Sequence, residues 1–253
     1  FKALEISEGD EVIVTSRTFI ASVSSIVNAG ASPVFVDIDL ESQNIDPRFI
    51  QKKITSKTKA IVCVHLAGWP CEMDEISQIA IKNGIFIIED CSQAHGAKYK
   101  GKSVGSIGDI GCWSFCQDKI MTTGGEGGMV TTNSEKLWKK MWSYKDHGKN
   151  YDLAHSRSPS NVYRYIHDSF GTNWRMTEMQ AAIGLIQLRK MDDWHKQRNK
   201  NAHQIWSAAK KCKGLRVPSI SDDIDHAAYK CYIFVNASQL KSTWSREKII
   251  NEI

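Results

Sequence analysis

The first 135 residues alternate between short apolar runs and amphipathic stretches. The apolar runs are rich in β-branched residues, as in EVIVT and AIVCVH, and predict strands. Between them, apolar residues recur at spacings of three and four, which predicts helices. The strands are expected at 11–15, 33–38, 60–65 and 85–90, and the helices at 19–30, 46–54 and 73–84. Continuous apolar strands separated by helices are typical of a parallel sheet that is buried on both faces. The pattern therefore predicts an α/β fold with a mostly parallel sheet sandwiched by helices.

The rhythm changes after residue 90. We expect strands at 111–116 and 129–132, followed by a helix at 134–144 and a polar loop at 148–172. One long helix is expected at 176–211, a late strand at 227–235, and the start of another helix from residue 245 on. We assign residues 1–190 to a large domain that lacks its N-terminal part. Residues 191–253 form a connecting helix and the start of a smaller α+β domain. Both ends break off within a pattern, so we interpret the sequence as the middle of a longer polypeptide.

Composition narrows the class of protein. The chain has 253 residues, 42% of them hydrophobic, which is enough to bury a substantial core. The net charge of +5 comes from basic residues spread along the chain, which argues against a dedicated nucleic-acid surface and suits small anionic ligands. No apolar run approaches the roughly 18 residues that cross a bilayer, so we expect no membrane partner.

Seven cysteines are spread mostly through apolar runs. An odd number in such places predicts reduced, buried thiols in a cytoplasmic protein. Zinc is the alternative, because Cys63, His65, Cys71 and Cys91 lie near predicted strand ends. They form no C-x-x-C pair, however, and we predict no metal site.

Two acids, Glu89 and Asp90, close a predicted buried strand. Ligands of parallel sheets lie beyond the carboxyl ends of the strands. A carboxylate buried there is costly unless a cation or a donor meets it. A cap on the following segment is the alternative explanation for one of these acids.

About thirty residues later, SFCQDKIMTTGGEGGMV places Ser114 before a turn and Lys119 after it. A partly desolvated lysine loses its proton more readily and can then form a Schiff base. Taken alone, Lys119 is better explained as a solvated loop residue and GGEGG as a plain turn. In combination, the acid, the lysine and the serine suit pyridoxal 5'-phosphate (PLP). That cofactor needs an acid for its ring nitrogen, a lysine for its aldehyde, and hydroxyls and amides for its phosphate.

The motifs that carry a family resemblance follow one another through roughly residues 5 to 240. They are GDEVIVTSRTFIASVSSIVNAGASPVFVDID, VHLAGWPCEMDEI, IIEDCSQAHGAKYKGKSVGSIGDIGCWSF, KIMTTGGEGGMVTTN and GTNWRMTEMQAAIGLIQL. The sequence resembles the DegT/StrS-like sugar-nucleotide aminotransferases, which are fold-type I PLP enzymes.

The resemblance assigns roles residue by residue. It makes Lys119 the Schiff-base lysine and proton carrier, and Asp90 the partner of the pyridinium nitrogen. Gln93 would lie near the phenolic oxygen of the ring, and Phe19 would stack on the ring. Two phosphate ligands complete the implied site, Ser114 from this chain and Asn173 from the partner subunit of a homodimer with a shared active site.

Two departures from the family pattern affect these expectations. The small-residue G-T-x-A-L helix start, whose amides bind the phosphate in the family, is absent, so part of the phosphate site lies outside this chain or is lost. Most of the C-terminal region that helps to bind the sugar is also missing.

The implied reaction transfers an amino group from an amino acid, usually L-glutamate, to a keto-sugar nucleotide, as in amino-sugar and polysaccharide biosynthesis. Lys149, Arg157 and Arg164 are candidates for the diphosphate, although a solvated loop explains them as well. A PLP-dependent sugar dehydratase and a non-catalytic or regulatory PLP-binding relative are the alternatives. Dehydratases of this kind replace the lysine with histidine, so Lys119 disfavours the first.

Overall fold

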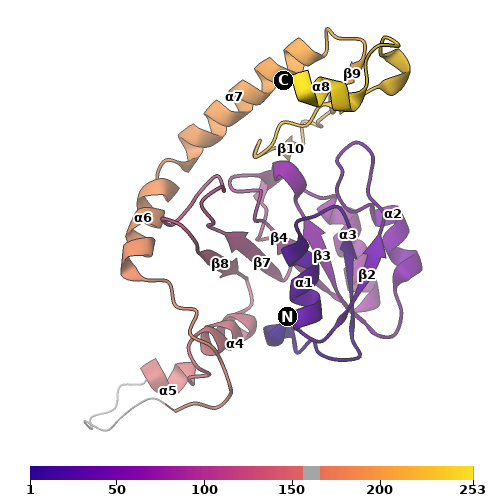
Figure 1. Ribbon diagram of the computed structural model, residues 1–253. Coiled ribbons are helices and arrows are strands. Elements are labelled where there is room, and N and C mark those ends of the chain that lie inside the picture. The colour runs from indigo at the N-terminus through magenta and orange to yellow at the C-terminus, as the bar shows by residue number, and fades with distance from the viewer. Residues whose placement is uncertain (156–165, 253) are drawn as a thin grey trace.

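A six-stranded sheet with helices on both faces forms the body of the computed structural model, which describes residues 1–155 and 166–252 (Figure 1). The strand order is β2-β1-β3-β4-β7-β8. The first four pairings in this order are parallel, and β7 with β8 is antiparallel. The predicted α/β fold with a mostly parallel sheet is therefore confirmed.

The strands lie close to the apolar runs that predicted them. The sheet comprises β1 (Glu11–Thr15), β2 (Ser32–Val36), β3 (Thr58–Val64), β4 (Phe86–Asp90), β7 (Ile110–Ser114) and β8 (Gly128–Thr131). Five two-residue strands lie outside it: β5 (Lys98–Tyr99), β6 (Lys102–Ser103), β9 (Leu215–Arg216), β10 (Ile224–Asp225) and β11 (Phe234–Val235). Of these, β10 pairs with β5, which ties the C-terminal segment to the body.

The helices follow the predicted order. They are α1 (Ile20–Asn28), α2 (Pro47–Ile50), α3 (Met73–Asn83), α4 (Glu135–Lys145), α5 (Tyr151–His155), α6 (Glu178–Leu188), α7 (Met191–Ala209) and α8 (Arg246–Glu252). Short 3₁₀ turns are η1 (Lys2–Leu4), η2 (Gln51–Lys53), η3 (Leu66–Gly68) and η4 (Ala237–Gln239). Among the described residues, no helix combines the length and apolar character that a membrane span requires.

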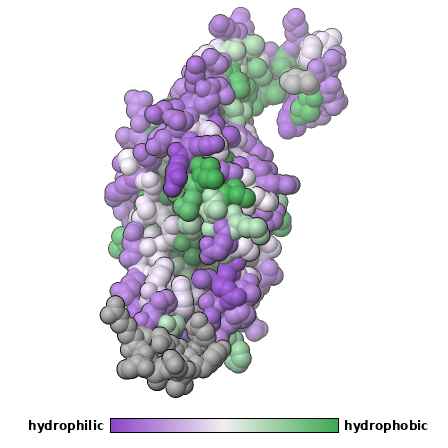
Figure 2. All heavy atoms as spheres, turned by 90° about the vertical axis from the view of Figure 1, so that its left-hand side faces the viewer, coloured by the Kyte–Doolittle hydropathy of each residue, from purple (hydrophilic) through white to green (hydrophobic). Residues whose placement is uncertain are grey.

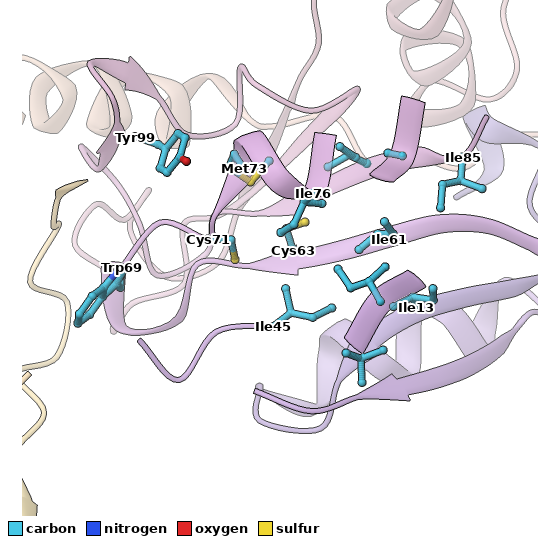
Figure 3. Packing of buried hydrophobic residues seen from close by; sticks show 14 of the residues in the cluster. Ile13, Ile45, Ile61, Cys63, Trp69, Cys71, Met73, Ile76, Ile85 and Tyr99 are labelled. Atoms are coloured by element: carbon cyan, nitrogen blue, oxygen red, sulfur yellow. The ribbon is translucent and has the colours of Figure 1, made fainter. Parts of the chain in front are cut away.

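Alternate residues of the central strands β1, β3 and β4 pack into two separate cores. On one face, Ile61 and Ile87 pack with Met73 and Ile76 of α3 (Figure 3). On the other face, Val62 and Ile88 belong to a cluster that includes Ile26 of α1. This alternation is the ordinary consequence of the two-residue period of a strand. It also sends consecutive residues at the end of β4 to opposite sides.

The single long helix expected at 176–211 is wrong. The segment forms two helices, α6 and α7, because the backbone turns more tightly at the end of α6. The amide of Lys190 donates to the carbonyl of Gln187, three residues back, and α7 then begins at Met191. Asp192 and Asp193 lie in the first turn of α7, where carboxylates favour a helix N-terminus.

The strand expected at 227–235 is mostly wrong. Only Phe234–Val235 forms a strand, and it pairs with Leu215–Arg216. Residues 227–230 instead bond to the chain that follows β3: the amides of Ala227 and Lys230 donate to the carbonyls of Gly68 and Ala67. The polar loop expected at 148–172 contains the short helix α5 within its described part.

Candidate active site

Five of the six predicted site residues follow strands of the sheet at its carboxyl edge. Phe19 follows β1, and Gln93 follows β4. Asp90 ends β4 and Ser114 ends β7, while Lys119 lies five residues beyond Ser114. Because β1, β4 and β7 run in the same direction, their carboxyl ends share one edge. This is the edge at which α/β proteins bind ligands.

Asp90 is held by a hydroxyl of α1. Ser22 Oγ donates to Asp90 Oδ2 at 2.6 Å, and the amide of Ser92 donates to Oδ1 at 3.1 Å. Thr18 Oγ1 lies 2.7 Å from Ser22 Oγ. Since the Ser22 proton points to Asp90, Thr18 must donate to Ser22, which gives a directed chain of hydroxyls. Asp90 thus accepts a local bond from the Ser92 amide in addition to its bond from α1.

Gln93 is fixed by the turn that follows β3. The amide of Ala67 donates to Gln93 Oε1 at 2.7 Å. Ala67 has a φ of 60°, a left-handed conformation that is uncommon for alanine. The side-chain Nε2 is therefore the atom of Gln93 that can contact a ligand.

Lys119 is half-enclosed, with 15% of its side chain exposed. Its Nζ lies 3.3 Å from Asp118 Oδ2 and 3.5 Å from the hydroxyl of Tyr229. Burial by itself lowers the pKa of Lys119, but Tyr229 and Asp118 act in the other direction, and the pKa lies above its ordinary value. Desolvation thus favours the neutral amine as expected, but the neighbouring acid and phenol outweigh it.

Ser114 and Phe19 are placed in line with their predicted roles. Ser114 Oγ accepts from the amide of Cys116 at 3.3 Å, so its proton remains available to an acceptor. Phe19 precedes α1 as its N-cap residue, and 68% of its surface is exposed. An aromatic ring exposed at this edge is able to stack on a ligand.

The loop that contains GGEGG is hydrogen-bonded to α6. Gln187 Oε1 accepts from the amide of Thr122, and Gln180 Nε2 donates to the carbonyl of Glu126. A Cβ on Gly127 would lie 2.2 Å from Thr123 Oγ1, so no larger residue fits there. The glycines thus allow the loop to fold tightly on itself and against α6.

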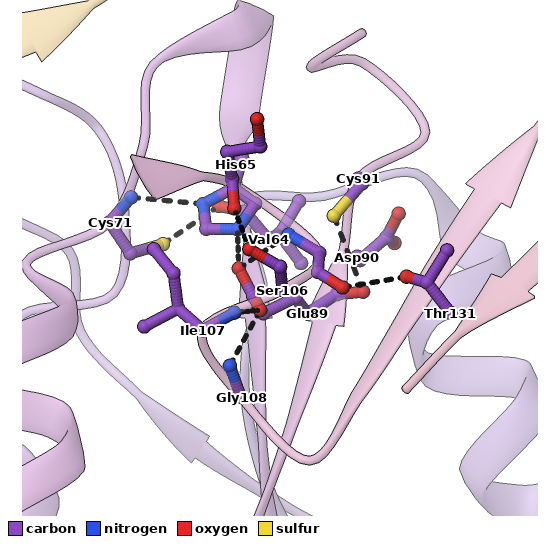
Figure 4. Close-up of polar contacts among 12 residues, drawn as sticks. Val64, His65, Cys71, Glu89, Asp90, Cys91, Ser106, Ile107, Gly108 and Thr131 are labelled. Carbon is purple, nitrogen blue, oxygen red and sulfur yellow. Dashed lines mark hydrogen bonds and ion pairs between the residues drawn. The ribbon is translucent and has the colours of Figure 1, made fainter. Parts of the chain in front are cut away.

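Glu89 points away from Asp90 into a closed polar cluster (Figure 4). Its carboxylate accepts from the amides of Gly105, Ile107 and Gly108 at 2.7–2.9 Å and from His65 Nε2 at 3.0 Å. Burial raises the pKa of Glu89, but the bonds from His65 and the amides outweigh it and hold the pKa below its usual value.

The same cluster bears on the zinc alternative. His65, Glu89 and Cys91 have ligand atoms within 4.8 Å of one another. His65 Nδ1, however, accepts from the amide of Cys71 at 3.0 Å, so neither ring nitrogen has a free lone pair. The described residues here are committed to hydrogen bonds within the protein.

Asn173 lies apart from the other five. It forms a bridge with Asp146 beyond the end of α4. Asp146 also binds Arg175 and Lys149, so it fixes the segment that carries Asn173. Its role as a ligand supplied to a partner stays a prediction, as does that of Lys149; Arg157 and Arg164 lie outside the described residues.

Sequence reasoning missed Ser22, Asp118 and Tyr229. Ser22 of α1 lies four residues after Thr18, which precedes the helix, and this is a spacing at which two side chains can meet. Asp118 adjoins Lys119 and could have been noticed. Tyr229 is 110 residues from Lys119 along the chain, and no sequence spacing signals their contact.

The structure has the fold of the fold-type I aminotransferases. An aminotransferase from Psychrobacter cryohalolentis aligns with a TM-score of 0.96 and 59% identity over 99% of this chain and 66% of its own. Spr1654 from Streptococcus pneumoniae, solved in a PLP-form, aligns with a TM-score of 0.82 and 27% identity over 93% of this chain and 63% of its own.

The chain belongs to the DegT/DnrJ/EryC1/StrS aminotransferase family, whose model matches residues 1–253. GDP-perosamine synthase of Escherichia coli O157:H7 is 50% identical over 192 residues, which are 76% of this chain and 50% of that protein. A dTDP-3-amino-3,6-dideoxy-alpha-D-galactopyranose transaminase of Aneurinibacillus thermoaerophilus is 40% identical over 89% of this chain and 58% of that protein. The chain thus spans about half to two thirds of the length of these relatives.

The residues at the sheet edge fit PLP, the cofactor of this family. They offer an amine for an aldehyde, a carboxylate for a ring nitrogen, a hydroxyl for a phosphate and an exposed aromatic ring for stacking. The family resemblance inferred from the motifs is confirmed.

Proposed function

We propose that the protein is a PLP-dependent aminotransferase that acts on a keto-sugar nucleotide. One observation carries this proposal: adjacent parallel strands, β4 and β7, bring Asp90 and the Lys119 turn to one edge of the sheet. The amine and the carboxylate that such a cofactor requires thereby come from neighbouring elements.

Each residue has a task that follows from its contacts. Lys119 would hold the cofactor covalently and, when free, carry a proton on Nζ. Asp90, held by Ser22, would keep the ring nitrogen protonated. Gln93 would donate from its amide nitrogen, and Ser114 from its hydroxyl to the phosphate. Bound PLP supplies a carbonyl that accepts amines and a ring that accepts electrons.

The substrate class comes from the relatives. Two of those named above carry the names of a GDP-linked and a dTDP-linked sugar, and a UDP-N-acetyl-3-dehydro-alpha-D-glucosamine 3-aminotransferase of Acidithiobacillus ferrooxidans is 44% identical over 72% of this chain. We infer an amino-acid donor, L-glutamate by family resemblance, and a keto-sugar nucleotide as acceptor. The product would serve amino-sugar or polysaccharide biosynthesis in the cytoplasm.

A second copy of the chain is the proposed partner. Apolar side chains gather on the face that carries α6 (Figure 2). The exposed ones on α6 are Met179, Ile183, Leu185, Ile186 and Leu188. A patch of this kind on one helix is typical of an interface. A homodimer through this face would also allow Asn173 to reach the partner's phosphate. Leu185→Asp should lower the mass measured by light scattering, while Ile81→Asp, at an exposed position on α3, should not.

We retain the proposed division into a PLP-binding domain, residues 1–190, and a second domain that begins with α7. The break between α6 and α7 at residues 189–190 supports this boundary.

Absorbance and covalent trapping test the function. The purified protein should be yellow with PLP, and borohydride should fix the cofactor to Lys119. Glutamate should bleach the colour, and the correct keto sugar from a panel of UDP-, dTDP- and GDP-linked 3- and 4-keto sugars should restore it. Activity that persists in a colourless Lys119→Ala variant would overturn the proposal.

A further inference from the structure

The hydroxyl of Tyr229 lies within hydrogen-bond distance of both Lys119 and Asp118. The hydroxyl lies 2.8 Å from Asp118 Oδ2 and 3.5 Å from Lys119 Nζ. The lysine Nζ also lies 5.3 Å from the centre of the Tyr229 ring. Since the phenol donates its only proton to the carboxylate, its lone pair faces the amine. The three groups therefore form a directed chain of three hydrogen bonds: Lys119 donates to Tyr229 and to Asp118, and Tyr229 donates to Asp118.

The backbone around Tyr229 is fixed from two sides. On one side, the amide of Lys230 donates to the carbonyl of Ala67 at 3.2 Å, and that of Ala227 donates to the carbonyl of Gly68 at 2.9 Å. On the other side, Arg198 Nη2 of α7 donates to the carbonyl of Tyr229 at 3.3 Å. The position of the phenol is thus set by the fold and does not depend on a free side chain finding its place.

Close packing adds to this placement. A Cβ on Gly68 would lie 2.8 Å from the Cβ of Ala227, so the two segments approach each other as closely as glycine permits. Ala67, between this segment and the sheet, gives its amide to Gln93 and its carbonyl to Lys230. The Tyr229 segment is therefore connected to the predicted ligand of the ring oxygen as well as to Lys119.

The charges agree with the directed chain. The hydrogen bond from Tyr229 holds the pKa of Asp118 at about 2, so the carboxylate is charged at neutral pH. Burial raises the pKa of Tyr229, and its bond to Asp118 does the same, so the phenol keeps its proton. The other titratable groups packed here are His95, Cys116, Arg198 and Lys230.

We propose that Tyr229 is a positioning residue of this site, which accepts a hydrogen bond from the free amine of Lys119 and, with Asp118, holds that amine in one place. The proposal rests on the proposed function of Lys119 as the cofactor anchor. Whenever the lysine is not bonded to the cofactor, the pair gives it one resting position with a proton in place. Nothing in the position of Tyr229 along the sequence signals this role.

Lysine labelling in the cofactor-free chain tests the contact directly. Trinitrobenzenesulfonate modifies only neutral amines, and mass spectrometry of the peptide that contains Lys119 gives the pH of half-labelling. Tyr229→Phe keeps the ring but removes the acceptor, so the midpoint should move to lower pH. The matched control is Tyr232→Phe in the same segment, whose midpoint should coincide with that of the unaltered protein.

Kinetics with PLP bound give a second measurement. Tyr229→Phe should lower kcat by up to about a hundredfold, the lower end of the range for one general acid–base contribution, with a smaller change in KM. Asp118→Asn should move the labelling midpoint in the same direction, which keeps the proposal testable if one variant folds poorly.

The outcomes separate this proposal from the proposed function. If borohydride fixes PLP to Lys119 in all variants but the Tyr229→Phe and Asp118→Asn midpoints stay where they were, the role of Tyr229 is overturned alone. If PLP is not fixed to Lys119 in the unaltered protein, the proposed function fails, whatever the midpoints show.

Discussion

Glu89 and Asp90 are consecutive carboxylates at the end of β4, yet their surroundings differ completely. Glu89 is fully buried and accepts from three amides and from His65. Asp90 is half-buried, and the described residues supply it with two donors, Ser22 and the amide of Ser92. A carboxylate offers about four acceptor positions. Glu89 is therefore saturated by the protein, whereas Asp90 keeps capacity for a ligand.

The alternation of the strand produces this difference. Ile87 and Ile88 already face the two opposite cores, and Glu89 and Asp90 continue the same two directions. One carboxylate meets the closed loop at 105–108, and the other meets α1 at the open edge. The comparison teaches that burial and saturation mark a structural acid, while a carboxylate with spare acceptor capacity at an open edge is able to meet a ligand.

The largest expected effect is on stability at Glu89. Glu89→Ala leaves four buried donors without a partner, and each unmet buried group costs about 1–3 kcal/mol. We expect the free energy of unfolding in urea to fall by at least about 3 kcal/mol. Glu89→Gln retains one acceptor oxygen and should lose less. A Glu89→Ala variant as stable as the unaltered protein would break the comparison.

Asp90→Asn should lower activity and leave stability nearly unchanged, the reverse of Glu89→Ala. The amide keeps the shape and can still accept from Ser22, so the free energy of unfolding should change little. Without the charge, the ring nitrogen loses its counter-ion, and we expect kcat to fall on the order of a hundredfold. Steady-state kinetics beside urea unfolding separate the two effects. A loss of stability as large as that of Glu89→Ala would show that Asp90 is also structural.

Acid should destabilise the unaltered protein more than the Glu89→Gln variant. The pKa of Glu89 is lower in the folded state than its ordinary value because His65 and the amides bind the charged form despite burial. Its stabilisation is therefore complete above the unfolded value of about 4.3 and is lost as the pH falls through the folded value. The difference in unfolding free energy between the unaltered protein and Glu89→Gln should be constant above about pH 5 and narrow below about pH 4. A constant difference down to pH 3 would contradict this.

The sequence predicted the sheet and the positions of Lys119 and Asp90 well. Apolar runs such as EVIVT and FIIED form parallel strands, and a parallel sheet places the carboxyl ends of its strands at one edge. The motifs predicted the family correctly, and the roles they imply for the site residues stay predictions.

What the sequence did not reveal depends on tertiary contacts. Glu89 and Asp90 look alike in the sequence, and only the amides of the loop at 105–108 distinguish them. The break at residues 189–190 was missed because the apolar spacing continues through it. Tyr229 was placed in a strand because its segment is apolar, although bonds to Ala67 and Gly68 hold that segment over the Lys119 turn.

The smallest expected effect is the sharpest test of how Asp90 is held. Ser22→Ala removes the 2.6 Å donor and leaves the carboxylate charge in place. A hydrogen bond to a charged group contributes about 1.5 kcal/mol at the lower end of its range, so the Kd of PLP should rise roughly tenfold. Ser25→Ala is the matched control, because the Ser25 hydroxyl on the same helix donates to the Ser22 carbonyl and not to Asp90. Equal PLP affinities in fluorescence titrations of the two variants would mean that Ser92 alone orients Asp90.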